Sequence, residues 1–326
     1  MLFWIRSPRP GCIFFNALIF DYKMARDRNF ITANNHTWAY LKYGKGQPIL
    51  ILHGINNYAD YLVPLGNLLA SDFEVIIPDL PGCGFTARLK EKNSYQNVSK
   101  ELLNFVKALG IEKFSLFGFS LGGAISLEMA LNYPESIENL IVQSPPWRSK
   151  SIHLDLLGKI QLKLASSPKI IEAVQKNPEL LKKIIMQARR VKTDADKLLN
   201  GYGSEIAEAV SLIDVRASKE FYDSLRKADF GKEINRINDK MAERTLLIAP
   251  ENDSLIPITE IIDLSRILKN SAMVVVYDQD HEIILEAPEI MARILRDSIL
   301  FRKSTESSDL HWWRPIRTES RIYDLN

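Results

Sequence analysis

The sequence predicts an α/β fold, built as a mostly parallel eight-stranded sheet with helices on both faces. Short runs rich in β-branched and aromatic residues alternate with longer helical patterns over most of the chain, the order expected when helices connect parallel strands. Near-continuous apolar runs such as ILIL and LLIA match strands that are buried on both faces. Between residues 144 and 241 the alternation stops and apolar residues recur at helical spacing, which indicates an insertion.

The strands and helices follow one another along the chain. Asn34 and Asn35 favour the tight turn of a hairpin, so the first two strands are predicted to pair antiparallel. Predicted strands cover residues 30–33, 37–43, 49–53, 73–78, 113–118, 139–143, 245–249 and 272–277. Apolar positions three and four apart predict helices near 58–70, 95–109, 120–132, 258–269 and 288–301.

These patterns divide the chain into a core, an insert and two terminal segments. We interpret residues 28–144 and 241–302 as the core, because the strand pattern returns at Thr245. Residues 145–240 are predicted to form a helical lid over the carboxyl edge of the sheet, and a separate helical domain is the alternative. Residues 303–326 lack apolar periodicity, which predicts a mobile tail.

The N-terminal extension, residues 1–27, has an uncertain status. Its apolar run at 11–20 loosely imitates a signal sequence, but it is too short to span a bilayer and is interrupted by Asn16. An initiator at Met24, or a packed extension, is favoured over a signal peptide. We therefore expect no stable membrane insertion.

Composition narrows the class of function. With 46% hydrophobic and 25% charged residues, the chain is typical of a soluble globular protein. Its 42 basic and 40 acidic residues give a charge of +2, which indicates no nucleic-acid partner. Cys12 and Cys83 have no metal-ligand spacing and suit a reducing cytoplasm, where we expect the protein to reside. No cofactor or metal is expected, and the oligomeric state is not indicated.

The most informative stretch is 113–124, KFSLFGFSLGGA, in which Gly118, Ser120 and Gly122 fit the spacing Gly-x-Ser-x-Gly. A buried strand before it and a small-residue helix start after it predict a sharp turn at the serine. Glycines two residues away on either side remove Cβ atoms that would clash there. The next N–H and the helix N-terminus would face an anion beside the hydroxyl. Ser120 is the predicted nucleophile, and a merely structural turn is the alternative.

Further motifs stand in a fixed order around this turn. His53 ends a strand, Asp79 opens DLPGCGFT, and after the serine come Asp253 in PEND and finally His281. With these motifs the chain resembles the α/β-hydrolase superfamily over roughly residues 28–302. The resemblance implies the α/β-hydrolase fold and a hydrolase that uses serine, aspartate and histidine in that chain order.

A serine at its free pKa is a poor nucleophile, so a general base must lie beside it. Of the five histidines, His281 follows the last predicted core strand, where a loop can bring an imidazole above the sheet edge. His36 lies in the early hairpin, His53 before a loop, His153 in the insert and His311 in the tail. His281 is therefore the predicted base.

Asp253 is the predicted partner of the base. It follows the strand at 245–249, at a position that matches the family, and would hold the imidazole without taking its proton. Glu251 is the closer rival. Asp278 and Asp280 share the loop of His281, where neighbouring side chains diverge.

The resemblance also assigns donors to the oxyanion that forms during acyl transfer. These are the backbone N–H groups of Ile55 and Leu121. His53 is predicted to brace the loop and Asp79 to tie loops together. The predicted substrate-binding residues are Phe119, Leu121, Tyr58, Trp147 and Leu255.

A serine nucleophile disfavours the haloalkane dehalogenases and epoxide hydrolases of this superfamily, whose nucleophile is aspartate. We expect hydrolysis of a small or medium acyl ester or thioester through an acyl-enzyme. An acyltransferase or C–C bond hydrolase with the same residues, and a ligand-binding protein with negligible turnover, remain alternatives, because the fold does not decide among them.

Charge in the insert bears on the substrate. Residues 148–197 contain twelve lysines and arginines against five acidic residues. Such a surface would attract an anionic or carrier-bound acyl substrate. Solvated outer faces of amphipathic helices explain the same charges, and this interpretation is favoured.

Overall fold

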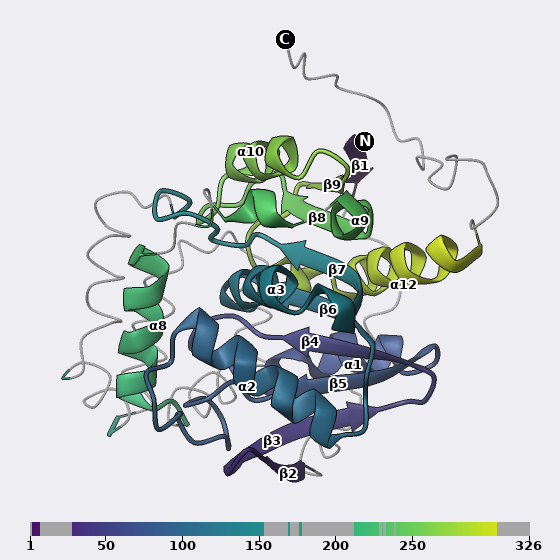
Figure 1. Ribbon diagram of the computed structural model, residues 1–326. Coiled ribbons are helices and arrows are strands. Elements are labelled where there is room, and N and C mark those ends of the chain that lie inside the picture. Colours follow the sequence, from purple (N-terminus) through teal and green to yellow (C-terminus); the bar gives the residue numbers. More distant parts are fainter. Residues whose placement is uncertain are drawn as a thin grey trace.

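The computed structural model describes residues 2–6, 28–152, 169, 176–177, 212–227, 230, 233–237 and 239–304. Its centre is one sheet with the strand order β1-β9-β8-β7-β6-β4-β5-β3-β2 (Figure 1). Strand β3 pairs antiparallel with both β2 and β5, and the other described pairs are parallel. The predicted mostly parallel sheet is confirmed.

Eight of the nine strands are the predicted ones, with ends shifted by no more than two residues. They are β2 (Asn29–Ala33), β3 (His36–Tyr43), β4 (Gln47–Leu52), β5 (Phe73–Pro78), β6 (Phe114–Phe119), β7 (Ile137–Gln143), β8 (Thr245–Pro250) and β9 (Ala272–Tyr277). The turn at Asn34 and Asn35 is also confirmed. Both residues have positive φ, of 49° and 60°, and they join a hairpin in which Ala33 pairs with His36.

The predicted count of eight strands is one short. Strand β1 (Leu2–Arg6) pairs parallel with β9, so the edge of the sheet is formed by the N-terminal extension. An unpaired edge strand offers a row of backbone N–H and C=O groups to any extended segment that reaches it. No strand is predicted at LFWIR, because this run stands apart from the alternating pattern of the core.

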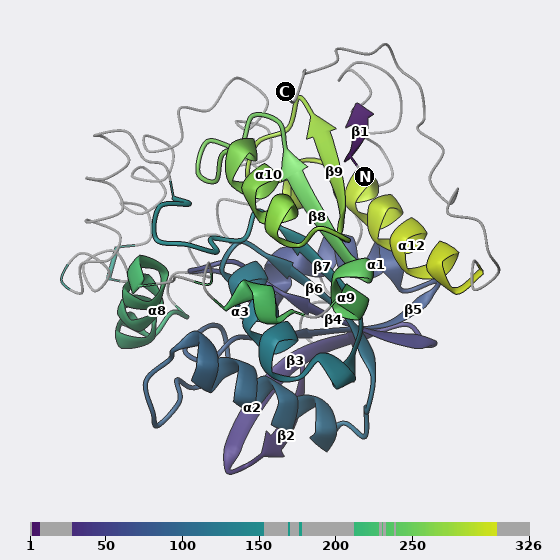
Figure 2. The ribbon, with the colours of Figure 1, turned by 45° about the horizontal axis from the view of Figure 1, so that its top comes forward.

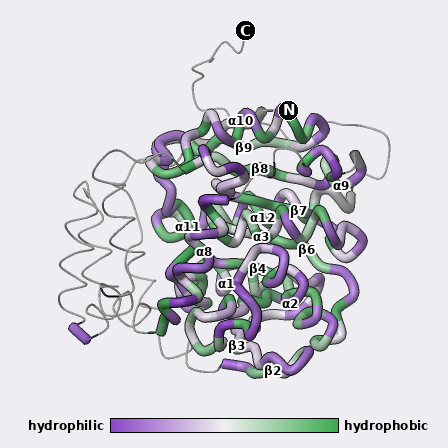
Figure 3. The backbone as a smooth tube through the Cα atoms, turned by 60° about the vertical axis from the view of Figure 1, so that its left-hand side comes forward, coloured by the Kyte–Doolittle hydropathy of each residue, from purple (hydrophilic) through white to green (hydrophobic). Residues whose placement is uncertain are grey.

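Helices cover both faces of the sheet (Figures 1 and 2). All five predicted helices are confirmed. The first begins as a 3-10 turn, η2 (Ala59–Leu62), and continues as α1 (Val63–Leu69). Residues of a strand alternate between two hydrophobic cores, as Leu50 lies in one and Ile49 and Ile51 in the other. In Figure 3 the hydrophobic colour runs through the central strands. One core contains residues of α2 (Tyr95–Ala108), α3 (Leu121–Asn132) and α10 (Ile258–Ile267), and the other contains residues of α1 (Val63–Leu69), α11 (Ile283–Glu286) and α12 (Pro288–Ser304).

Part of the predicted lid is described. Helix α8 (Val215–Lys227) buries Phe221 and Leu225 in the core on the α2 and α3 side, and it is followed by η5 (Ile234–Arg236) and α9 (Asp239–Glu243). The helices predicted between 153 and 211, most of the N-terminal extension and the tail after Ser304 lie outside the described residues. Within the described part, no helix combines the length and apolarity needed to cross a membrane.

The position of β4 determines where a site can form. The chain builds β5 on one side of β4 and then crosses over to build β6 on the other side. In open α/β sheets, ligands bind at the carboxyl ends of strands next to such a change of direction. Here that edge carries Ile55, after β4, and Ser120, after β6.

Candidate active site

Ser120 is the residue at which β6 ends and α3 begins. Its φ of 53° and ψ of −116° define a backbone conformation that residues other than glycine rarely adopt. The N–H of Ser120 donates to the carbonyl of Gln143 at 2.9 Å, which ties the turn to the end of β7. The strained turn predicted from the motif is therefore confirmed, and the half-buried serine retains access to solvent.

The two flanking glycines are required by close backbone contacts. A Cβ at Gly118 would lie 2.3 Å from the carbonyl oxygen of Gly122 and from Ser126 Oγ. A Cβ at Gly122 would lie 2.4 Å from the carbonyl oxygen of Leu52, at the end of β4. Helix α3 thus starts in contact with the neighbouring strand, and this contact determines the height of Ser120 above the sheet.

His281 and Asp253 are hydrogen-bonded to each other at the same edge of the sheet. His281 follows β9 and Asp253 follows β8, and His281 Nδ1 lies 3.0 and 2.9 Å from Asp253 Oδ1 and Oδ2. Both side chains are buried. An ionised carboxylate can only accept, so Nδ1 donates and the lone pair of the neutral imidazole is on Nε2. That is the tautomer required of a general base.

The other carboxylates considered as partners of His281 accept hydrogen bonds from backbone N–H groups instead. Glu251 accepts the N–H of Asp278 at 3.1 Å, and Asp280 accepts the N–H groups of Ser254 and His281 at 2.9 and 2.6 Å. These bonds shape the two loops that bring Asp253 and His281 together.

Two residues at the end of β7 hold the pair in place, and neither was predicted. The Ser144 hydroxyl, fully buried, donates to Asp253 Oδ2 at 2.6 Å. Gln143 Nε2 donates to the carbonyl of His281 at 2.9 Å, while the Gln143 carbonyl binds Ser120. Gln143 therefore links the backbones of Ser120 and His281. No local motif marks these two residues, because their role depends on the register of β7 against its neighbours.

The charges of the pair support each other. Burial alone would raise the pKa of Asp253, but the charge and hydrogen bond of His281, together with the Ile256 N–H and the Ser144 hydroxyl, hold that pKa below its usual range. Burial alone would lower the pKa of His281, and the Asp253 carboxylate outweighs this effect and raises it. The imidazole is therefore a stronger base than burial would allow.

The assigned oxyanion donors lie beside Ser120. Leu121 is the first residue of α3, and a Cβ placed on Gly54 would be 3.6 Å from the Cβ of Ser120, which brings the Ile55 loop to the serine. Neither the Ile55 nor the Leu121 N–H donates a hydrogen bond to any residue that the structure describes. Both are available to a ligand group.

His53 braces this loop, as predicted. Its Nδ1 donates to the Gly54 carbonyl at 2.8 Å, and its Nε2 accepts the Leu80 N–H at 3.0 Å. Complete burial lowers the pKa of His53 to about 4, so the ring stays neutral and keeps both bonds at ordinary pH.

Asp79 is likewise a tie between loops. Its carboxylate accepts the N–H groups of Ala59 at 2.7 Å and Phe85 at 2.9 Å, and it pairs with Arg28 at 3.0 Å. Its oxygens are used by these contacts, which agrees with the predicted structural role.

The predicted substrate-binding residues fall in different surroundings. The ring of Phe119 is 5.1 Å from that of His281, so this residue lies against the base. Leu255 is 36% exposed and lies two residues after Asp253. Leu121 is buried at the start of α3, and Tyr58 is buried with the Arg28 guanidinium 5.2 Å from its ring. Of the five predicted substrate-binding residues, Phe119 therefore lies beside His281, and Leu255 lies close to Asp253 along the chain.

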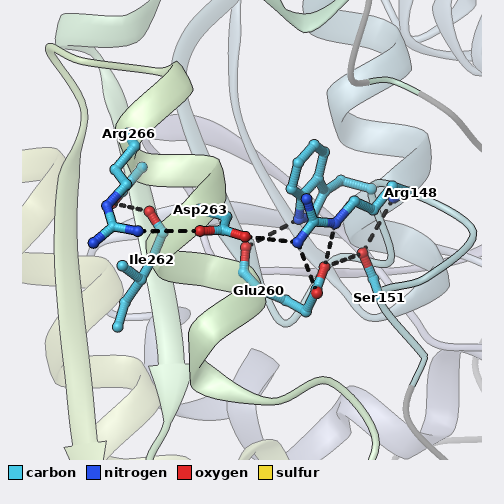
Figure 4. A network of polar contacts seen from close by, with 8 residues as sticks. Arg148, Ser151, Glu260, Ile262, Asp263 and Arg266 are labelled. Atoms are coloured by element: carbon cyan, nitrogen blue, oxygen red, sulfur yellow. Dashed lines mark hydrogen bonds and ion pairs between the residues drawn. The ribbon is translucent and has the colours of Figure 1, made fainter.

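Trp147 takes part in a network of polar contacts that fastens the start of the insert to α10, in which Figure 4 labels Arg148, Ser151, Glu260 and Asp263. Its Nε1 donates to the Glu260 carbonyl at 3.0 Å, and the Arg148 guanidinium lies 4.4 Å from its ring. Arg148 donates to both carboxylate oxygens of Glu260 at 2.8 Å and to Asp263 at 2.7 Å, and Ser151 donates to Glu260. The charge of Arg148 is thus neutralised within the protein and does not attract a substrate.

Within the described ranges, no group of three or more histidine, cysteine, aspartate or glutamate side chains is arranged to hold a metal ion.

Comparison with known proteins gives a consistent picture. A family model described as the alpha/beta hydrolase fold matches residues 47–288. The chain is similar to an uncharacterized protein of Mycobacterium tuberculosis, 27% identical over 152 residues that make up 45% of each chain. It spans less than half the length of the first curated relatives it matches.

Two further relatives carry descriptive names. The chain is 27% identical over 186 residues to 2-hydroxy-6-oxo-6-phenylhexa-2,4-dienoate hydrolase of Burkholderia cepacia, covering 47% of this chain and 65% of the relative. Its fold is similar to that of a thermophilic esterase from Thermogutta terrifontis, with a TM-score of 0.66 and 20% identity over 85% of this chain and 98% of that one. At such identity, the second likeness concerns the fold alone.

Proposed function

The chain belongs to the α/β-hydrolase family, and on this premise we propose that it is a serine hydrolase that cleaves a small or medium acyl ester or thioester. The observation that carries the proposal is the buried hydrogen bond between Asp253 and His281 at the sheet edge that bears the strained Ser120. A serine, an imidazole of the tautomer that a general base requires and two N–H groups with no acceptor among the described residues are the parts that acyl transfer requires.

In the proposed reaction Ser120 Oγ attacks the acyl carbon while His281 Nε2 takes its proton. The oxyanion of the tetrahedral intermediate is bound by the N–H groups of Ile55 and Leu121, and Asp253 stabilises the imidazolium. The leaving alcohol or thiol then departs with the proton from His281. Water, deprotonated by the same imidazole, then attacks the acyl-enzyme. Ser120 Oγ departs with the proton returned from His281, and the acid is released.

A fluorophosphonate probe tests the nucleophile. We expect it to label the wild-type protein and to leave Ser120→Ala unlabelled. A wild-type protein that is neither labelled nor active on any ester would instead support a ligand-binding function. A p-nitrophenyl ester series of rising chain length, run beside acyl-CoA thioesters, identifies the acyl group and the leaving group. Product analysis with an added alcohol distinguishes hydrolysis from acyl transfer.

A C–C bond hydrolase is the second candidate, because the Burkholderia cepacia relative, which matches 47% of this chain, is named a 2-hydroxy-6-oxo-6-phenylhexa-2,4-dienoate hydrolase. The same serine and histidine would serve an acyl carbon whose leaving group is a carbanion. Turnover of 2-hydroxy-6-oxo-6-phenylhexa-2,4-dienoate at a higher kcat/KM than any p-nitrophenyl ester would favour this candidate over the esterase.

A further inference from the structure

We propose that Asn56, Ser218 and Tyr222 form a clamp through which α8 positions the Ile55 N–H. This inference rests on the proposed function, in which that N–H binds the oxyanion. Asn56 follows Ile55 directly, whereas Ser218 comes 162 residues later in the chain. All three are positioning residues, because they act on the donor and not on the substrate.

The contacts determine how the Asn56 side chain is oriented. Ser218 Oγ donates to Asn56 Oδ1 at 2.7 Å, and Asn56 Nδ2 donates to the Tyr222 hydroxyl at 3.1 Å. Residues four apart in a helix lie on one face, so Ser218 and Tyr222 meet the carboxamide together. Ser218 is 2% exposed and Tyr222 8% exposed, so the two partners that α8 supplies are buried, while Asn56 itself is half-buried.

The backbone of Asn56 is the second observation. Its φ of 56° lies in the left-handed region, which few residues other than glycine, asparagine and aspartate adopt. The two bonds from α8 fix the side chain of the residue in this turn, one position after the donor.

His53 holds the same donor from the other side. The Gly54 carbonyl and the Ile55 N–H belong to one planar trans peptide and point in opposite directions. Because His53 Nδ1 binds the Gly54 carbonyl at 2.8 Å, the direction of the Ile55 N–H is constrained. The core therefore holds the peptide that carries the donor, and α8 holds the residue that follows it.

Helix α8 is itself anchored, so it can act as a support. Asp214 caps its first turn by accepting the N–H groups of Arg216 and Ala217, and its own N–H donates to the Gly82 carbonyl at 2.8 Å. Further along the helix, Glu220 accepts the Asn93 N–H at 2.8 Å. These bonds fix α8 to the loops that follow β5.

The test compares Ser218→Ala and Tyr222→Phe with Ser224→Ala, which removes a hydroxyl from the same helix that binds only the Glu220 carbonyl among the described residues. With p-nitrophenyl esters, we expect kcat to fall about ten-fold in the two clamp variants, with KM within two-fold of wild type, because a misplaced donor weakens transition-state binding. Asn56→Gly keeps the left-handed turn but removes the amide, so we expect a similar loss. Wild-type kcat in the clamp variants, or a change confined to KM, would overturn the clamp.

Hydrogen–deuterium exchange of peptides spanning residues 53–57 tests the clamp without turnover. We expect faster exchange in Ser218→Ala and Tyr222→Phe and wild-type exchange in Ser224→Ala, all at unchanged melting temperature. Unchanged exchange in the clamp variants overturns the proposal whether or not the protein is active. If the clamp variants exchange faster but the wild-type protein is neither labelled by the probe nor active on any ester, the clamp is supported and the proposed function is contradicted.

Discussion

On one side of Ser120 the proposed base is held by the sheet, and on the other side the proposed oxyanion donor is held partly by the insert. Asp253 and His281 follow β8 and β9. Their supports are Gln143, which ends β7, and Ser144, which follows it, so four residues at the ends of adjacent strands hold one another. The Ile55 loop instead lies between His53 and helix α8, which comes from the chain after residue 211.

This difference indicates how the two halves respond to change. The base side depends on the sheet, because β7, β8 and β9 pair with one another and their carboxyl ends lie side by side. The donor side depends in addition on α8, an element outside the sheet. Substitutions of the polar residues by which α8 contacts Asn56 are therefore expected to change the rate while leaving the core folded.

Removal of the base has the largest expected effect. His281→Ala should lower kcat about 10⁴-fold, because the serine loses the group that takes its proton. Steady-state hydrolysis of a p-nitrophenyl ester measures the loss, with His311→Ala as the matched histidine control that we expect to retain activity. Equal activity in the two variants would show that His281 is not the base.

Asp253→Asn should lower kcat by about 10³- to 10⁴-fold, since the amide does not hold the required tautomer or stabilise the imidazolium. The carboxylate raises the pKa of His281 against the effect of burial, which lowers it. The base works when neutral, so activity rises as pH passes upward through this pKa. Without the carboxylate the pKa falls, and the acid limb of kcat/KM against pH should move to lower pH. An acid limb that stays in place would contradict the coupling.

The donor side gives a stability prediction. Burial lowers the pKa of His53 from 6.5 to about 4, so on lowering the pH the unfolded chain is protonated first. The resulting stability is fully present above pH 6.5 and is lost progressively as pH falls toward about 4, by up to ~3 kcal/mol. Urea unfolding between these pH values measures it. His53→Gln, which does not titrate, should show a flatter dependence, and parallel curves would show that His53 is not responsible.

Ser144→Ala has the smallest expected effect. It removes one hydrogen bond to a charged acceptor, typically worth about 1.5–3 kcal/mol, and part of that loss should appear as a roughly ten-fold fall in kcat. Ser298→Ala is the matched control, because that buried hydroxyl binds the Leu295 carbonyl in α12. If both variants keep wild-type kcat, the Asp253–His281 pair is held well enough without Ser144.

Much of this structure could be predicted from the sequence. Apolar runs and turn residues located eight strands and the hairpin at Asn34, because parallel strands buried on both faces leave strong local signals. The elbow at Ser120 was predicted from glycine spacing, since the backbone contacts of Gly118 and Gly122 tolerate no side chain. The hydrogen bond between Asp253 and His281 was anticipated from their order along the chain.

What escaped prediction depends on contacts between distant segments. Gln143 and Ser144 look like ordinary strand-end residues until the register of β7 places them beside His281 and Asp253. The hydrogen bond between Asn56 and Tyr222 of α8 joins segments more than 160 residues apart. Strand β1, near the N-terminus, pairs with β9, the last strand of the core. Sequence periodicity describes how one segment is buried and carries no information about such partners.

Strands β6 and β7 are each followed directly by a serine with a positive φ, Ser120 at 53° and Ser144 at 47°. Glycine would relax the backbone at Ser120, and relief of backbone strain can add to heat resistance. At Ser144 it would also remove the buried hydrogen bond to Asp253. Directed evolution that screens for melting temperature alone would therefore favour glycine at position 120. The selected protein would have a higher melting temperature but would lack the proposed nucleophile. Selection for thermostability in this chain therefore needs a measurement of turnover from the first round.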